Sequence, residues 1–149
     1  MLDTFQPLLD AATGIDLSDP EAARAELNSR LDPASPEGKA VSAGLIELLE
    51  KGEVAYRGEA PVKFSRAAKA TEETHDFSID VVDMTGAGPR HLHPNGEINW
   101  CVALEGEPTF QGQAPGWVVE TPGSEHVPTV AGGRMLIVYL LPGGAMQFL

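Results

Sequence analysis

Residues 88–97 read GPRHLHPNGE, and the interpretation of the rest of the chain starts from this stretch. His91 and His93 are two residues apart, so in a β-strand both imidazoles would lie on the same face. The pair Asn95-Gly96 favours a tight turn directly after them. Directly after that turn, the carboxylate of Glu97 can lie close to the two imidazoles. The stretch therefore predicts several ligands of one metal ion.

A third imidazole comes from residues 121–126, TPGSEH, where a proline-glycine turn leads into His126. A lone histidine is more often an ordinary core or surface residue, but three of the four histidines share this pattern. We therefore expect one divalent transition metal held by the three histidines and Glu97. Nitrogen and oxygen ligands suit iron, manganese, nickel or zinc. His75 stands apart, and we expect it at the surface.

The second half of the chain carries the pattern of a mainly β structure. Short runs that are apolar, or that alternate between apolar and polar residues, are separated by Gly and Pro turn signals. The predicted strands cover residues 77–81, 97–104, 116–120, 134–141 and 145–148. Many short strands with such turns indicate a sandwich or barrel.

The first third of the chain is rich in Ala, Leu and Glu, and it predicts helices. Asp19-Pro20 has the form of an N-cap followed by proline at the first helical position, and Ser18 with Glu21 offers an alternative capping box. Ser35-Pro36 repeats the signal. Gly52 is a plausible end of the helix that follows, because glycine is common just past a helix.

The change from helical to strand pattern divides the chain near residue 53. An additional short helix is expected over residues 2–12. We expect residues 1–57 to form a helical N-terminal segment that packs on a barrel of residues 58–149, within one compact domain.

The formal net charge of −12 argues against nucleic acid and anionic membranes as partners, because both would repel the protein. The single cysteine, Cys101, cannot form an intrachain disulfide, and a buried inert thiol is expected. The N-terminus lacks the basic start and apolar run of a signal peptide, and the longest apolar run, residues 135–141, is too short to span a bilayer. We expect a cytoplasmic protein.

The two histidine segments resemble the two short motifs of the cupin superfamily. Residues 88–97 match the core of the first motif, and residues 123–126 match the proline-and-glycine turn and histidine of the second. The resemblance implies a mainly β fold, an RmlC-like jelly-roll antiparallel barrel, preceded here by an α-helical N-terminal segment. Dimers are common among cupins, so a homodimer is also expected.

The register of the first motif leaves two choices for the fourth ligand. Cupins usually place the closing glycine seven residues after the glutamate, whereas Gly106 lies nine residues after Glu97. Counting back seven from Gly106 reaches Asn99, which would share a strand face with Glu97. Glu97 is the better ligand chemically, because an anionic oxygen binds a dication more strongly than an amide. The ligand could still be Asn99, or the site could hold three histidines alone.

The chain from His91 onward is also similar to bacterial 4-hydroxylaminobenzoate lyases of nitroaromatic degradation. The stretches behind this resemblance are HLHPNGEIN (91–99), ALEGEP (103–108), PGWVV (115–119) and GGRMLIVYLLPGG (132–144). The resemblance implies a metal-dependent lyase that converts 4-hydroxylaminobenzoate to 3,4-dihydroxybenzoate (protocatechuate) and releases ammonium. Its substrate would be a small aromatic acid.

This chemistry suggests roles for individual residues. A dication can polarise the N–O bond as a Lewis acid, and Glu97 can act as general acid or base if the metal does not occupy it. Asn99 would hydrogen-bond the substrate. Arg134 is the candidate for the benzoate carboxylate, because arginine offers a bidentate fork, while Arg90 more plausibly faces outward.

Two other functions fit the same residues, because a fold does not fix a function. The chain could be a cupin dioxygenase or isomerase acting on another small acid, or a non-catalytic module that binds a small ligand. A dioxygenase would consume oxygen, the lyase would release ammonium without oxygen, and a binding module would turn over neither substrate.

Overall fold

The computed structural model describes residues 1–149, beginning with three helices that start where the sequence predicts. They are α1 (Leu2–Ala12), α2 (Pro20–Arg30) and α3 (Pro36–Glu50). The side chains of Asp19 and Ser35 each accept a hydrogen bond from the backbone amide three residues further on. These bonds satisfy amides that the first helical turn leaves without a partner. Gly52, just beyond α3, has a φ of +73°, a conformation that favours glycine.

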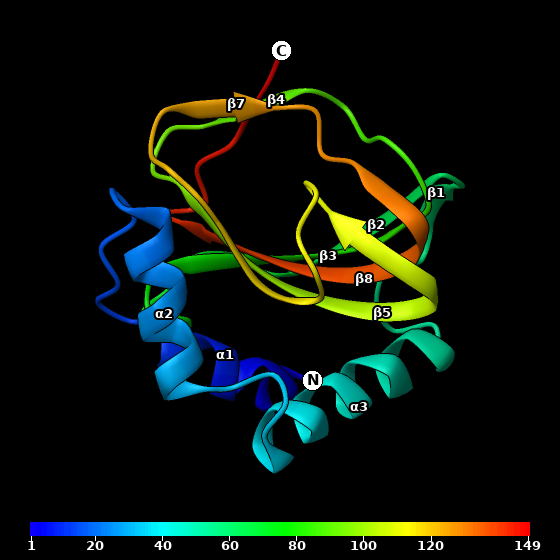
Figure 1. The fold of residues 1–149 in the computed structure, drawn as a ribbon, viewed down its shortest axis with the longest axis horizontal. Helices are drawn as coiled ribbons and strands as arrows, with labels where there is room; N and C mark the ends of the chain where they lie inside the picture. The colour runs from blue at the N-terminus through cyan, green and yellow to red at the C-terminus, as the bar shows by residue number, and fades with distance from the viewer.

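The remaining chain forms two antiparallel sheets that face each other (Figure 1). The larger sheet contains, in spatial order, β1 (Arg57–Glu59), β2 (Val62–Ala68), β3 (Phe77–Met84), β8 (Val130–Pro142), β5 (Glu97–Phe110) and β6 (Gly116–Glu120). The smaller sheet contains β7 (Ser124–His126), β4 (His91–His93) and β9 (Gln147–Phe148). In Figure 1, β4 and β7 lie across the top, opposite the helices.

The three helices cover one face of the larger sheet (Figure 1). A core of 25 buried residues joins them to it and includes Leu8, Leu27 and Leu45 from the helices. From the sheet, Trp100 and Trp117 enter this core with their ring centroids 4.8 Å apart. The Trp100 indole N–H donates to the Ser42 hydroxyl at 3.1 Å, and that of Trp117 donates to the Leu31 carbonyl at 2.9 Å. These two bonds tie the helical layer to the sheet.

The opposite face of the larger sheet lines the interior between the two sheets. Side chains alternate along a strand, so in β5 Ile98 and Trp100 lie in the helix-facing core while Cys101 lies in a second core of nine buried residues. Glu97 and Asn99 share the side of Cys101 and are fully buried. The sheet thus brings polar groups into the interior, beneath β4 and β7.

The predicted fold class is confirmed: the chain is mainly β, with antiparallel sheets and an α-helical N-terminal segment. Strands β3, β5 and β8 extend beyond their predicted bounds, and four strands, β1, β2, β4 and β7, lie outside the predicted strand ranges. β1 and β7 have three residues each, too few for a periodic pattern. The division at residues 57 and 58 remains a prediction.

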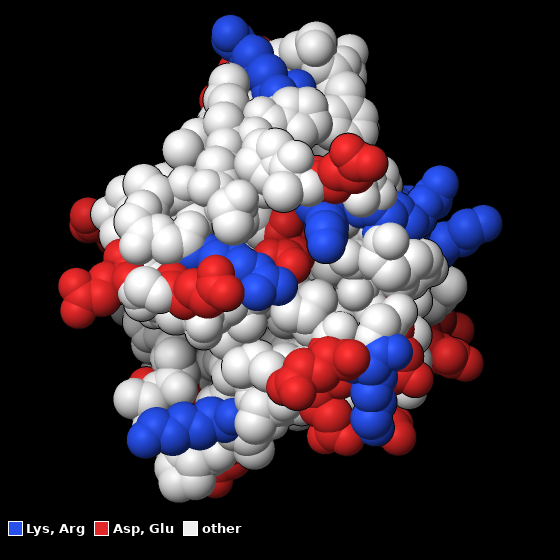
Figure 2. Space-filling model, turned by 90° about the vertical axis from the view of Figure 1, so that its right-hand side faces the viewer, with Lys and Arg blue, Asp and Glu red and all other residues white.

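None of the three helices combines the length and apolar character needed to cross a membrane. On the face shown in Figure 2, Lys and Arg side chains lie among Asp and Glu side chains and do not form a continuous basic patch. This distribution agrees with the acidic net charge of −12.

Candidate metal centre

The three motif histidines meet because two short strands pair. β4 and β7 are antiparallel, and the register sets His91 opposite His126 and His93 opposite Ser124. Gly96, with a φ of +85°, turns the chain from β4 toward β5, which brings Glu97 beneath the same two strands. A local spacing of two residues and one long-range strand pair therefore assemble the site.

Four ligand atoms from these residues lie within 4.8 Å of one another. The Nε2 atom of His126 is 3.2 Å from the Nε2 atoms of both His91 and His93. A carboxylate oxygen of Glu97 is also 3.2 Å from His93 Nε2. The side chains are at most 11% exposed, so water has little access to the group.

The Glu97 carboxylate lies 3.2–3.8 Å from the three histidines, with Asn99 beside it, and which of the two is a ligand stays a prediction. The Asn99 side-chain amide donates to Glu97 Oε2 at 3.2 Å and so lies beside the carboxylate. The other carboxylate oxygen of Glu97, Oε1, and the amide oxygen of Asn99, Oδ1, are both buried without a hydrogen-bond partner. A buried oxygen of this kind is costly unless an additional positive group satisfies it.

The surroundings of the cluster keep the Glu97 carboxylate ionised and shift the pKa values of His91 and His126 in opposite directions. Burial raises the pKa of Glu97, but His91 and His93 lower it by more, to about 2. Burial lowers the pKa of His126 to about 4, against the opposing charge of Glu97. For His91, burial lowers the pKa, but Glu97 raises it by more, and the net pKa lies above the ordinary value.

Hydrogen bonds at the far side of two rings fix where their protons lie. The Pro89 carbonyl, 3.2 Å from His91 Nδ1, can only accept, so Nδ1 carries the proton. The Ser124 hydroxyl donates to the Thr121 carbonyl at 2.6 Å, so it accepts from His93 Nδ1 at 3.2 Å. In the neutral rings, the Nε2 lone pairs of His91 and His93 therefore point into the cluster, as metal ligation requires.

His126 has a different arrangement. The Thr129 amide donates to Gln111 Oε1 at 2.7 Å, which turns the Gln111 side-chain nitrogen toward His126 Nδ1, also at 2.7 Å. Because that nitrogen is a donor, a neutral His126 carries its proton on Nε2, facing the other histidines. A cation at Nε2 requires the proton on Nδ1 instead, where Glu120 Oε1, 3.5 Å away, can accept it.

The donor set fits a divalent transition metal. With metal–nitrogen bonds of about 2.0–2.1 Å, neighbouring ligand atoms of a tetrahedral site lie about 3.3 Å apart. Three separations here are 3.2 Å, and those from Glu97 to His91 and His126 are wider, at 3.8 Å. The lone pairs of His91 and His93 converge, and the unsatisfied oxygen of Glu97 is directed to the same group. Without a cation, the Nε2 proton of His126 is the donor that faces these lone pairs and the carboxylate.

The structure does not bring Arg134 to this cluster. Strand β8 alternates, and Arg134 lies on the side of Leu136 and Val138, which belong to the helix-facing core. Its guanidinium makes two hydrogen bonds to Asp83, at 2.7 and 2.8 Å. The proposed substrate carboxylate would have to displace this pair on the wrong side of the sheet, so we do not retain Arg134 as a substrate-binding residue.

The other expectations about single residues agree with the structure. Arg90 faces outward and is paired with Glu125. His75 is an exposed residue that lies 3.2 Å from Asp10. Cys101 is buried, and burial raises the pKa of its thiol well above the ordinary value, so it is unreactive.

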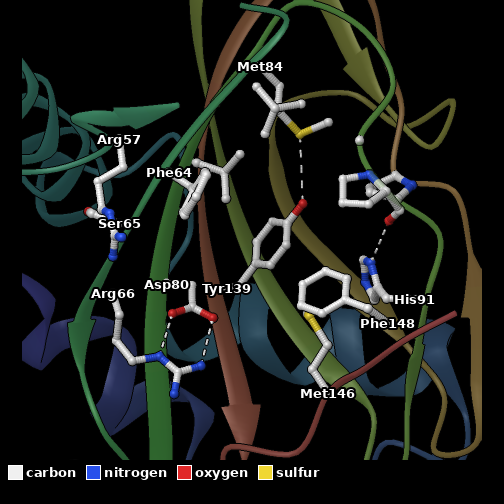
Figure 3. A pocket seen from close by; sticks show the side chains of 15 residues that line it. Arg57, Phe64, Ser65, Arg66, Asp80, Met84, His91, Tyr139, Met146 and Phe148 are labelled. Atoms are coloured by element: carbon white, nitrogen blue, oxygen red, sulfur yellow. Dashed lines mark hydrogen bonds and ion pairs between the residues drawn. The ribbon is translucent and has the colours of Figure 1, made fainter. Parts of the chain in front are cut away.

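Sequence reasoning missed two polar residues beside the cluster, Gln111 and Glu120, and a pocket that reaches it. The pocket has a volume of about 460 Å³ and is lined by residues that include His91, Tyr139 and Phe148 (Figure 3). No local signal marks these residues. Glu120 reaches the site because β6 pairs with β5 in a register that sets it opposite Glu97.

Comparison with known proteins gives matches of two kinds. The sequence model of the family described as "PnbB: 4-hydroxylaminobenzoate lyase" matches residues 10–148. Proteins named 4-hydroxylaminobenzoate lyase from Nocardioides sp. (strain LMS-CY) and Pseudomonas putida are 35% and 32% identical over 56% of this chain. This chain spans about half the length of these relatives, 54% and 57% respectively.

Solved structures with a similar backbone are more distant in sequence. An RmlC-like cupin protein from Ralstonia eutropha JMP134 aligns at 17% identity over 64% of each chain, with a TM-score of 0.47. A cupin-like protein from Thermotoga maritima MSB8 aligns at 14% identity over 65% of this chain and 86% of that chain, with a TM-score of 0.45.

Proposed function

The chain belongs to the 4-hydroxylaminobenzoate lyase family, and from that premise we propose that it converts 4-hydroxylaminobenzoate to 3,4-dihydroxybenzoate. The conversion takes up one water, breaks the N–O and C–N bonds, and releases ammonia, which is ammonium near neutral pH. The observation that carries the proposal is the cluster of His91, His93, Glu97 and His126 beside an aromatic-lined pocket. The reaction belongs to nitroaromatic degradation, and we propose that it takes place in the cytoplasm.

We propose that the three histidines and Glu97 hold one divalent transition metal. When bound, such an ion supplies a Lewis acid toward the oxygen of the hydroxylamine. Glu97 remains ionised because its pKa is about 2, so it offsets the charge of the dication. Asn99 acts as a positioning residue, because its amide hydrogen bond orients the carboxylate of Glu97.

Proton transfer is better assigned to Glu120 than to Glu97. The side chain of Glu120 is 20% exposed, and both burial and the charge of Glu97 raise its pKa above the ordinary value. A carboxyl with a raised pKa can hold a proton and release it at a working pH where Glu97 cannot. In this scheme Glu120, which does not line the pocket, exchanges protons with the reacting nitrogen through water, and Glu97 serves as a ligand.

An assay with oxygen excluded tests the proposed function. The purified protein, incubated with 4-hydroxylaminobenzoate, should form ammonium and 3,4-dihydroxybenzoate in equal amounts, and elemental analysis should find a bound transition metal. His93→Ala should lose both the metal and the activity. Turnover that depends on oxygen would favour a dioxygenase, and binding without turnover would favour a ligand-binding module; either result overturns the proposal.

A further inference from the structure

The pocket beside the cluster has the size and lining of a small-molecule site. Its volume of about 460 Å³ lies within the range of about 300–1,000 Å³ typical of ligand sites. It lies between β2, β3 and β8 of the larger sheet and β4 and β9 of the smaller sheet. Phe64, Met84, Tyr139, Met146 and Phe148 provide apolar walls on several sides (Figure 3). These flat and flexible side chains suit an aromatic ring.

One end of the pocket adjoins the histidine cluster. His91 belongs to both, and its ring centroid is 6.4 Å from that of Tyr139 and 6.2 Å from that of Phe148. The Tyr139 hydroxyl has a single hydrogen-bond partner, the sulfur of Met84, 3.7 Å away. A ring held between Tyr139 and Phe148 would therefore present a substituent to the cluster.

Toward β1 and β2, the pocket contains two arginines with different surroundings. Arg66 donates two hydrogen bonds to Asp80, at 2.8 and 3.2 Å, so a carboxylate already balances its charge. Arg57, on β1, has no carboxylate within 4.0 Å, and its guanidinium carbon lies 5.8 Å from the centroid of the Phe64 ring. Arg57 is the cation of this pocket that is free to bind an anion.

We propose that this pocket binds an aromatic monocarboxylate with its carboxylate at Arg57 and its para substituent at the His91 end. The inference rests on the proposed function, since the reaction changes the hydroxylamino group and its neighbouring carbon but leaves the carboxylate intact. The reacting end must therefore lie at the cluster, and the unchanged anion at the opposite end. Arg57 takes over the role that the sequence suggested for Arg134.

The charge requirement predicts a specific preference among ligands. A ring bearing a carboxylate should bind more tightly than the same ring bearing a neutral amide, because only the anion makes a charge-assisted hydrogen bond with a guanidinium. The rest of the contact surface is apolar and should not distinguish the two. The difference in affinity between the two ligands therefore measures the contribution of Arg57 separately from that of the aromatic side chains.

Titration calorimetry with 4-hydroxybenzoate and 4-hydroxybenzamide tests this inference on the metal-loaded protein. The wild type should bind the acid about tenfold more tightly than the amide, and Arg57→Gln should remove this preference while leaving amide binding unchanged. Arg57→Lys should restore part of it. Arg134→Gln is the matched control, since it removes a guanidinium outside the pocket, and it should keep the preference.

Two results would overturn the inference: equal affinities for acid and amide in the wild type, or an Arg57→Gln variant that still prefers the acid. The titrations measure binding alone, so they are separable from the proposed reaction. If the acid preference depends on Arg57 but no ammonium is released, the subsite stands and the lyase proposal fails. If ammonium is released while Arg57→Gln keeps its KM, the reaction stands and the subsite assignment fails.

Discussion

The two faces of strand β5 differ sharply in composition although both are buried. Ile98, Trp100 and Val102 point toward the helices and belong to the apolar core there. Glu97 and Asn99, which alternate with them, point into the interior beneath β4 and carry a charge and an amide at zero exposure. An antiparallel strand with one solvated face would place such polar residues in water.

The comparison shows that one side of the sheet provides most of the apolar burial, while the other side carries the polar residues of the candidate site. Burial of apolar surface against the helices supplies the favourable free energy of folding. Burial of a carboxylate and three imidazoles costs free energy unless a partner compensates it. The helix-facing side therefore supports a site on the other side whose polar groups are arranged for a ligand.

Truncating a large side chain on the helix-facing side should have the largest effect. Trp117→Ala removes a fully buried indole and its bond to Leu31, so the free energy of unfolding should fall by about 3–5 kcal/mol, measured by urea titration. Metal bound per folded molecule should stay the same. Trp117→Phe, which keeps a ring, should lose less. A parallel loss of metal affinity in the folded fraction would show that the two faces are not separable.

Removing a ligand on the interior side should have the converse effect. His93→Ala should weaken metal binding by at least about 100-fold, or about 2.8 kcal/mol, in a competition titration with a chelator. His75→Ala removes an exposed histidine outside the cluster and serves as the control. Metal binding by His93→Ala equal to that of the wild type would exclude His93 as a ligand.

Changing the outer partner of His93 should have a smaller effect on the same measurement. Ser124→Ala removes the group that accepts from Nδ1, so the ring loses its fixed proton position, and metal affinity should fall by about tenfold. The exposed Ser29, whose hydroxyl bonds only its own helix, provides a matched Ser29→Ala control. Equal affinities for the two variants would contradict the role of Ser124.

Acid should destabilise the metal-free protein modestly through the interior side. The pKa of His126 is lowered to about 4, so between the ordinary value of 6.5 and about 4 the unfolded chain binds more protons, and stability falls as pH falls. His91 acts in the opposite direction, because its raised pKa stabilises the fold below its unfolded value. We therefore expect a net loss of stability from pH 7 to pH 4.5 that is smaller than the His126 shift alone would produce. His126→Ala should flatten this pH dependence in urea titrations; an unchanged slope would contradict the assignment.

Local patterns in the sequence predicted much of this arrangement. Helix caps, the shared face of His91 and His93, and the turn at Gly96 depend on neighbouring residues, so they can be identified without the fold. His126 was suggested by the proline-glycine turn that precedes it and by its match to a family motif. Its pairing with His91 is a contact across 35 residues, which periodicity does not encode.

The positions that the sequence did not predict depend on how the strands pair. Arg134 was expected at the cluster but lies on the helix-facing side of the sheet, the side on which Leu136 and Val138 pack. Alternation along a strand shows which residues share a side, but not which side faces the helices. Glu120 was missed because it reaches the site through its pairing with Glu97. Arg57, the residue proposed to bind the carboxylate, lies on the three-residue strand β1, which carries no pattern.

The paired indoles of Trp100 and Trp117 give the protein a built-in optical reporter of one layer only. Both are buried on the helix-facing side, in mutual contact and hydrogen-bonded to the helical segment. Their emission should therefore follow undocking of the helices, while a ligand in the pocket has no direct contact with either ring. A change of tryptophan fluorescence on ligand addition would mean that the sheet transmits a displacement from one side to the other.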